Sequence, residues 1–158
     1  MAYNSITASA PGSMMLFGEH AVLEGHTAIA MAIAERLTVK IITREDNQIH
    51  IHTTLGNYQT TLSALTIEKP FQFILGVLQQ YQPQLTHGFN IVVESAFSHL
   101  KGFGSSAAVT VALVAALDYF LSDKINKEKL FLTSRGIIQQ VQGRGSGADA
   151  LASTMGAI

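Results

Sequence analysis

Three short segments of the sequence contain residues whose types and spacing could do chemistry. The first, residues 102–108, reads Gly-Phe-Gly-Ser-Ser-Ala-Ala and comes directly before a helical pattern. Its glycines would let the backbone approach a ligand closely, and the free N–H groups at the start of the helix would attract phosphate. A serine at that point could cap the helix, hydrogen-bond a phosphate oxygen or ligate Mg²⁺.

This loop alone does not decide between a binding site and a structural turn. It lacks the closing Gly-Lys-Ser/Thr of a Walker A loop and the third glycine of a dinucleotide-binding loop. An N-capped helix that follows a tight turn would give the same sequence. On the loop alone, phosphate binding and simple capping therefore stay open with equal weight.

The other two segments combine glycine with ionisable side chains. Gly18-Glu19-His20 puts a carboxylate beside an imidazole, a pair that suits a small polar substrate. Residues 143–149 read Gly-Arg-Gly-Ser-Gly-Ala-Asp, so Asp149 falls near a helix start, where it could accept a proton from an alcohol or orient that alcohol. The structural alternatives are a solvated turn for the Glu-His pair and a helix-capping role for Asp149.

Strands must position these segments. Ser5–Ala10 predicts a strand that stops at the turn signal Pro11-Gly12. Asp46-Asn47 predicts a hairpin turn between two strands. The remaining strands are predicted at Leu37–Thr43, Gln48–Thr53, Tyr58–Leu62 and Phe89–Glu94.

Helices dominate the second half of the chain. Apolar residues at helical spacing follow Pro70, and Asn126 is a plausible N-cap for a helix over Lys127–Gln142. Two more helices are predicted at about Ser105–Leu121 and at Ala148–Thr154. Strands first and helices later predict an α+β fold, with the Ser105–Leu121 helix buried between the sheet and the other helices.

The composition excludes several classes of protein. With 47% hydrophobic and 13% charged residues the chain is not a disordered polar one, and a net charge of −1 gives no electrostatic case for nucleic acid or an anionic membrane. Cysteine is absent, which excludes disulfides and thiolate metal sites. The start of the chain lacks a secretory signal pattern, and the apolar stretch Ala107–Leu121 is too short and too interrupted to favour a membrane span over a buried helix.

In order and content the three segments resemble the GHMP kinases, named for galactokinase, homoserine kinase, mevalonate kinase and phosphomevalonate kinase. Within that superfamily, Gly-Glu-His-Ala-Val-Leu-x-Gly at residues 18–25, followed by Ala28-Ile29-Ala30, is most similar to the mevalonate kinases. The resemblance covers residues 5–158 and implies a two-layer fold related to ribosomal protein S5 domain 2. It identifies residues 1–158 as an N-terminal ATP-binding domain whose C-terminal domain is missing.

The resemblance also implies roles for individual residues, with ATP and Mg²⁺ as cofactors. Asp149 would be the base or orienting group for the substrate hydroxyl, and Ser13 would hold a second catalytic position. Glu19, His20 and Asp149 would line the substrate pocket, and Ser106 would help to hold Mg²⁺. The loop that wraps the ATP phosphates would be Gly102, Phe103, Gly104, Ser105, Ser106 and Ala107.

Two positions depart from the family pattern. The family's N-terminal motif usually reads Ala-Pro-Gly-Lys, and residues 10–13 here read Ala-Pro-Gly-Ser. Ser13 thus stands in place of the lysine, with one hydrogen bond to donate and no charge. Mevalonate kinases usually carry a magnesium-binding glutamate on the helix before the third segment, and a gapless alignment puts Ile138 at that place. We therefore expect a different substrate or weak activity.

The function implied is ATP-dependent phosphorylation of a small alcohol, with mevalonate the best guess, as a cytoplasmic step of isoprenoid biosynthesis. Phosphomevalonate kinase, a sugar kinase and diphosphomevalonate decarboxylase share such loops and stay open, as does a non-catalytic S5-like remnant. The S5-like fold also occurs in nucleic-acid-binding proteins, but the chain has no basic stripe. We expect no nucleic-acid or membrane partner, and a homodimer is left open.

Overall fold

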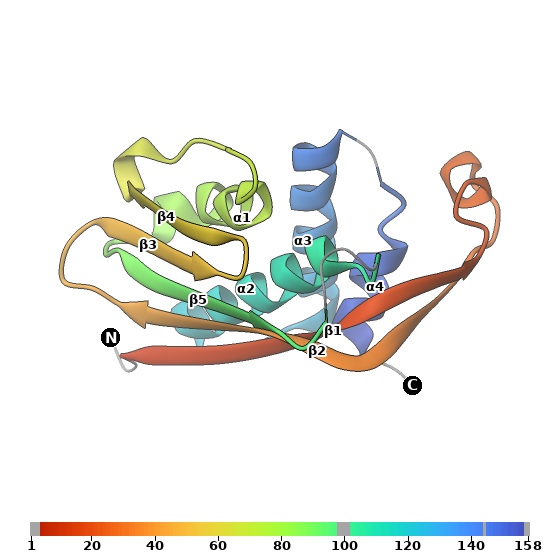
Figure 1. The fold of residues 1–158 in the computed structure, drawn as a ribbon, viewed down its shortest axis with the longest axis horizontal. Helices are drawn as coiled ribbons and strands as arrows, with labels where there is room; N and C mark the ends of the chain where they lie inside the picture. The colour runs from red at the N-terminus through yellow and green to blue at the C-terminus, as the bar shows by residue number, and fades with distance from the viewer. Residues whose placement is uncertain (1–3, 98–101, 144, 157–158) are drawn as a thin grey trace.

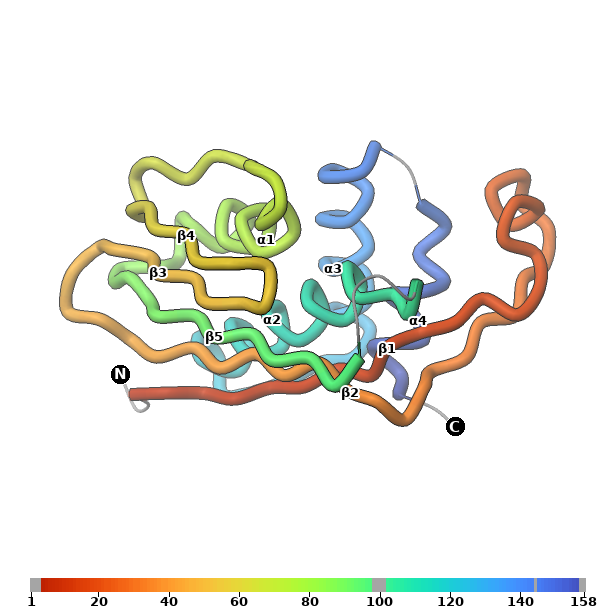
Figure 2. Tube along the Cα trace, viewed as in Figure 1, coloured from red at the N-terminus to blue at the C-terminus, as the bar shows by residue number. Residues whose placement is uncertain are grey.

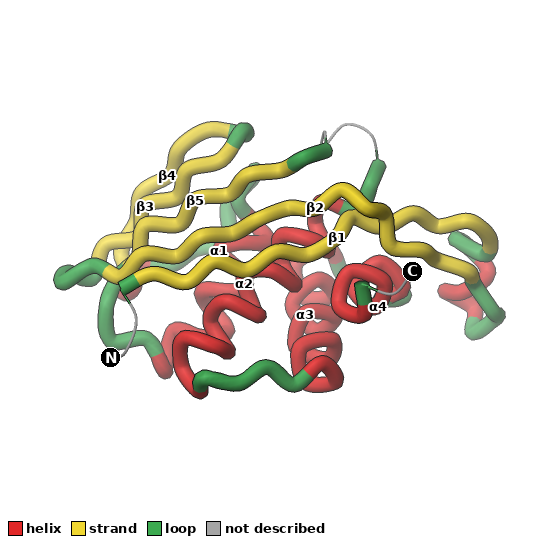
Figure 3. Tube along the Cα trace, turned by 90° about the horizontal axis from the view of Figure 1, so that it is seen from below, coloured by secondary structure: helices red, strands yellow, loops and turns green. Residues whose placement is uncertain are grey.

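The computed structural model describes residues 4–97, 102–143 and 145–156. In that part of the chain, five strands form one mixed sheet in the order β1-β2-β5-β3-β4, and the helices cover one of its faces (Figures 1 and 3). Neighbouring strands are antiparallel except β3 and β5, which are parallel. The strands are β1 (Ser5–Phe17), β2 (Ile29–Thr43), β3 (Gln48–Thr53), β4 (Gly56–Thr61) and β5 (Phe89–Ser95).

Four α-helices and three short 3₁₀ turns are described in the same ranges. The helices are α1 (Gln72–Tyr81), α2 (Ser105–Ser122), α3 (Lys127–Gln142) and α4 (Ala148–Met155). The 3₁₀ turns are η1 (Ala21–Glu24), η2 (Leu62–Ala64) and η3 (Gln82–Gln84). Asn126 caps α3 as expected, because its side-chain oxygen accepts a hydrogen bond from the Lys129 backbone N–H at 3.0 Å.

Helix α2 forms the centre of the core, as the sequence predicts. It is long and apolar enough to cross a membrane, but 67% of it is buried inside the protein, which is typical of a core helix. Leu113 and Leu117 on α2 are fully buried in one hydrophobic cluster with Val39 and Ile91 of the sheet and Leu75 of α1. Each such side chain contributes about 1.5–3 kcal/mol when it leaves water.

The first strand is longer than the sequence predicts. Pro11-Gly12 does not end it, because β1 continues to Phe17 with a register shift between Pro11 and Ser13. Proline lacks a backbone N–H, but β1 is an edge strand, where a missing donor and a bulge are both tolerated. This continuation places Ser13 inside the sheet rather than in a turn.

The predicted hairpin at Asp46-Asn47 is wrong. Strands β2 and β3 do not pair with each other, because β5 lies between them. The Arg44 N–H donates to the Gly88 carbonyl at 3.0 Å, and the Gly88 N–H donates to the Asp46 carbonyl at 2.7 Å, so the connection is held by the start of β5. The strand predicted at Tyr58–Leu62 is present as β4, paired with β3.

The end of β1 and the start of β2 continue past the body of the domain as a two-stranded arm (Figures 1 and 2). Met14 pairs with Met31 and Phe17 with Ile29 along it. Glu19 and His20 lie between the tip of β1 and the turn η1, so this arm positions the Gly-Glu-His segment.

Candidate active site

The candidate site is centred on a contact between Ser13 and Asp149. Ser13 is 0% exposed on β1, and its hydroxyl donates a hydrogen bond to Asp149 Oδ1 at 2.9 Å. Asp149 lies in the first turn of α4 and is itself exposed. The Ser13 backbone N–H donates to the Phe103 carbonyl at 3.0 Å. Segments separated by more than a hundred residues therefore meet at this serine.

Glycine allows the loop before α2 to pack directly on β1. Gly104 has the left-handed φ of 65°, and a Cβ there would lie 2.0 Å from the Ser13 hydroxyl oxygen. A Cβ on Gly12 would lie 2.7 Å from the Phe103 carbonyl oxygen. Larger residues at either position would separate the loop from the strand, so these glycines allow the close approach of the start of α2 to β1.

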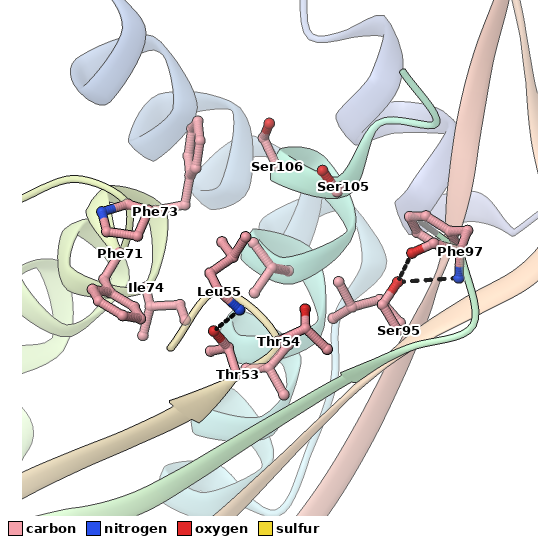
Figure 4. Close-up of a pocket in the computed structure, with 14 residues that line it drawn as sticks. Thr53, Thr54, Leu55, Phe71, Phe73, Ile74, Ser95, Phe97, Ser105 and Ser106 are labelled. Carbon is pink, nitrogen blue, oxygen red and sulfur yellow. Dashed lines mark hydrogen bonds between the residues drawn. The ribbon is translucent and has the colours of Figure 1, made fainter. Parts of the chain in front are cut away.

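The first of three neighbouring cavities among the described residues is an apolar pocket of about 150 Å³. Phe71, Phe73 and Ile74 from α1 and its N-terminal flank face it, with Phe97 on the opposite side, as Figure 4 shows. Ser105 and Ser106, the first two residues of α2, lie at its edge. Such a pocket suits a flat aromatic group whose polar end reaches the start of the helix.

The second cavity is a small polar cleft of about 90 Å³ at the N-termini of α2 and α4. Ser106 lines both this cleft and the apolar pocket, so the two are adjacent at that residue. Further described residues that line the cleft are Gly104, Ala107, Ile138, Gln142, Gly145, Ser146, Gly147, Asp149 and Ala150. Backbone N–H groups and hydroxyls at two helix starts suit the binding of phosphate.

The third cavity, of about 260 Å³, lies between the arm and the glycine-rich turn before α4. Glu19, His20 and Leu23 line it from the arm. Gln142, Gly145, Ser146 and Asp149 line both this cavity and the polar cleft. Asp149 therefore stands at the junction of the cleft and the cavity, within reach of ligands in either.

Comparison with known proteins shows the family to which this chain belongs. The profile of the family "GHMP kinases N terminal domain" matches residues 72–157, which is 86 of the 158 residues. The chain belongs to the GHMP kinase family. It is 36% identical over 149 residues to the mevalonate kinase of Archaeoglobus fulgidus and 31% identical over 160 residues to that of Saccharolobus solfataricus, covering 94% and 97% of this chain.

The fold of this GHMP domain is similar to those of solved structures. The mevalonate kinase of Methanococcus jannaschii superposes with a TM-score of 0.84 at 23% identity, covering 98% of this chain and 52% of that one. The chain spans about half the length of the curated relatives it matches, 50% for both relatives above.

The GHMP domain brings most of the expected site residues together. Ser13 and Asp149 touch each other, while Glu19 and His20 share a cavity with Asp149. Gly104, Ser106 and Ala107 line the polar cleft, and Ser105 lines only the apolar pocket. Phe103 contacts the site through its backbone carbonyl, which accepts from the Ser13 N–H. Its ring packs edge-on against Phe97, with 6.3 Å between the ring centroids. Gly102 is not among the residues that line these cavities.

Sequence reasoning missed several lining residues. Phe73 belongs to the apolar pattern that follows Pro70, and in the structure it is half-buried and faces the apolar pocket, which the more deeply buried Phe71 also lines. Helical spacing cannot separate the two. Gln142 lines both the polar cleft and the third cavity. Its position could have been inferred from the sequence, because it is the last residue of α3 and directly precedes the glycine-rich turn.

Charge is sparse in the polar cleft of the GHMP domain. Among the described residues that line it, Asp149 is the one with an ionisable side chain. Arg144, which belongs to the same glycine-rich segment, lies outside the described residues. Within the described ranges, no group of three or more histidine, aspartate or glutamate residues could hold a metal ion.

Proposed function

We propose that this domain is the nucleotide-binding and phosphoacceptor half of an ATP-dependent kinase that phosphorylates a small alcohol, with mevalonate as the first acceptor to test. The observation that carries the proposal is the succession of three adjacent cavities, in which Ser106 lines the apolar pocket and the polar cleft, and Asp149 lines the cleft and the third cavity. The resemblance to mevalonate kinases along 94% and 97% of the chain supports this acceptor.

The nucleotide would enter with its base in the apolar pocket. Phe71 and Phe73 offer aromatic surface there, and Ser105 and Ser106 lie at the edge toward the cleft. The phosphates would then pass Ser106 and reach the free N–H groups at the start of α2. Ser106 is the proposed side-chain contact to the phosphates, or to a Mg²⁺ ion that the nucleotide brings with it.

The residues of the cleft fit a protein-held Mg²⁺ poorly. This ion prefers six oxygen ligands in near-ideal octahedral geometry, usually with one or two carboxylates. The described lining offers two hydroxyls, one amide and Asp149, whose Oδ1 already accepts the bond from Ser13. When bound to the nucleotide, the ion would neutralise phosphate charge.

The acceptor alcohol would lie in the cavity lined by Glu19 and His20. Asp149 would accept the proton of the attacking hydroxyl or hold that hydroxyl in line with the terminal phosphate, a kind of help worth about 10²–10⁴-fold in rate. Ser13 is fully buried, so we assign it a positioning role through its bond to Asp149 rather than contact with the substrate. Catalysis of phosphoryl transfer is mostly positioning and charge stabilisation, which suits this division of work.

A non-catalytic nucleotide-binding domain is the second candidate function. Two observations favour it: Ser13 brings no charge to Asp149, and Ile138 presents an apolar side chain to the cleft. Such a domain would bind ATP and transfer nothing.

Two measurements on the purified protein test the proposal. Calorimetry with the non-hydrolysable ATP analogue AMPPNP should show binding, and ADP release should rise when mevalonate is added. Binding without any acceptor-dependent ADP release, even together with the second half of a relative, would favour the non-catalytic function. Absence of nucleotide binding would overturn both.

A further inference from the structure

We propose that this domain binds the nucleotide phosphates through the protein alone, so that nucleotide affinity depends little on Mg²⁺. The inference rests on the proposed function, because it concerns the same cleft. It goes beyond that function in assigning the phosphate affinity to neutral donors and in naming the side chain that keeps the metal out.

Ile138 lines the wall of the cleft with an apolar side chain. It is 9% exposed on α3 and packs in a small apolar cluster with Ala107 of α2 and Ala150 of α4. Both alanines belong to the first turns of the helices that form the cleft. An ion that approached from this side would meet methyl groups, and losing water ligands against an apolar wall is unfavourable for Mg²⁺.

Asp149 is the one carboxylate among the described residues that line the cleft, and one of its two oxygens is already engaged. Its Oδ1 accepts the hydroxyl bond of the fully buried Ser13 at 2.9 Å. Turning the carboxylate toward an ion in the cleft would leave that buried hydroxyl without this partner, which is costly. While this bond is kept, Asp149 can offer a metal ion in the cleft only its second carboxylate oxygen, Oδ2.

The start of α2 supplies neutral donors in place of the ion. Gly104 adopts its left-handed conformation as the N-cap, and the first bond of the helix runs from the Ala108 N–H to the Gly104 carbonyl at 3.0 Å. The N–H groups of Ser105, Ser106 and Ala107 thus precede the first intrahelical bond, at the positions where a helix has no carbonyl partner of its own for its N–H groups. An 18-residue helix also carries partial positive charge at this end.

The direct test is to titrate the protein with AMPPNP by calorimetry in excess Mg²⁺ and again in EDTA. The two dissociation constants should differ by less than about tenfold, which corresponds to 1.4 kcal/mol. A larger loss of affinity in EDTA would overturn the inference and leave the proposed function standing. Absence of binding in both buffers would instead remove the proposed function.

Two variants test the cause by adding a carboxylate to the cleft. Ile138→Glu and Gln142→Glu should each make affinity fall in EDTA by more than tenfold while affinity in Mg²⁺ is kept or improved. Gln142 is exposed, so its variant should fold even if the buried glutamate at position 138 does not. Gln140→Glu is the matched control, because it adds the same charge at an exposed position of α3 outside the cleft. If the folded cleft variants, like the control, bind AMPPNP with similar affinity in Mg²⁺ and in EDTA, the absence of a second carboxylate is not the cause, and the inference is wrong.

Discussion

At the residue scale, the site depends on one hydrogen bond that joins two distant segments. Ser13 keeps Asp149 in a fixed position, and nothing about either residue type predicts that contact. Aspartate in the first turn of a helix usually serves the helix itself. Here the hydroxyl of Ser146 accepts from the Ala148 N–H at the start of α4 at 3.2 Å, and Asp149 bonds across to β1 instead, which favours a functional over a capping role.

We predict that Asp149→Asn lowers turnover by about 10²–10⁴-fold in a chain completed with a second half, because the amide keeps the shape and cannot take the proton. AMPPNP affinity should stay nearly unchanged, and the melting temperature should move little, since asparagine also tolerates a helix start. Steady-state kinetics, calorimetry and thermal unfolding together measure this. Glu128→Gln, which removes a charge from an exposed position on α3, is the control, and equal turnover by both variants would disprove the catalytic assignment.

We further predict that Ser106→Ala weakens AMPPNP binding. The change removes the one hydroxyl shared by the apolar pocket and the polar cleft, while alanine keeps the helix start intact. A lost hydrogen bond to a charged group costs about 1.5–3 kcal/mol, or roughly ten- to a hundredfold in affinity. Calorimetry checks this against Ser122→Ala, at the far end of the same helix, and unchanged affinity would remove Ser106 from the site.

At the scale of elements, the loop between β5 and α2 can hold its position only if Gly104 stays small. We predict that Gly104→Ala destabilises the domain by about 1–3 kcal/mol, because the new Cβ would overlap Ser13 and the backbone is left-handed there. Gly136→Ala on α3 is the contrasting change, since a Cβ there meets open space and alanine favours helix by about 1 kcal/mol. Urea unfolding should give opposite signs for the two, and equal effects would contradict this packing.

The connection from β2 to β3 gives a pH prediction at the same scale. The Arg44 guanidinium bonds to Asp46 at 2.7 Å and lowers the pKa of that carboxyl to about 2. A lowered pKa in the folded state stabilises the protein above the ordinary value near 4, and that contribution is lost as pH falls toward 2. The difference in stability between the natural protein and Asp46→Asn should therefore shrink across this range in urea titrations. A constant difference from pH 6 to pH 2 would disprove the pairing.

Local signals predicted the elements well and their neighbours poorly. The bounds of α3 follow from the Asn126 cap and the glycine after Gln142, which are both local features. The neighbour of β2 could not be predicted, because β5 comes from later in the chain and local alternation is the same for either partner. The same contrast holds at the candidate site. Asp149 and Ser106 were indicated by local motifs, whereas the position of Phe73 at the apolar pocket depends on how α1 packs, which local sequence does not give.

At the scale of the whole molecule, the domain leaves its acceptor side open. An arm projects from the body of the domain (Figure 1). Glu19 and His20 follow its first strand, and Phe17 at the end of that strand is 72% exposed. Exposed apolar side chains also occur along both arm strands, at Leu16, Ile29 and Met31. Apolar surface gathered in one place commonly contacts another folded unit.

We predict that supplying a second half raises turnover above that of this chain alone. The relatives are about twice as long, so the C-terminal half of the Archaeoglobus fulgidus mevalonate kinase, 36% identical over the present half, is a suitable donor. A domain seated over the acceptor cavity would exclude water and hold the alcohol against Asp149, two effects that the open cavity cannot provide. ADP release with mevalonate should be measured for the chain alone, for the two halves joined, and for the joined form with Asp149→Asn. Activity that rises on joining and falls again with Asp149→Asn would show that the catalytic residue lies in this domain and that the other half covers the acceptor cavity. Equal turnover by the single domain would mean that residues 1–158 already form the complete site.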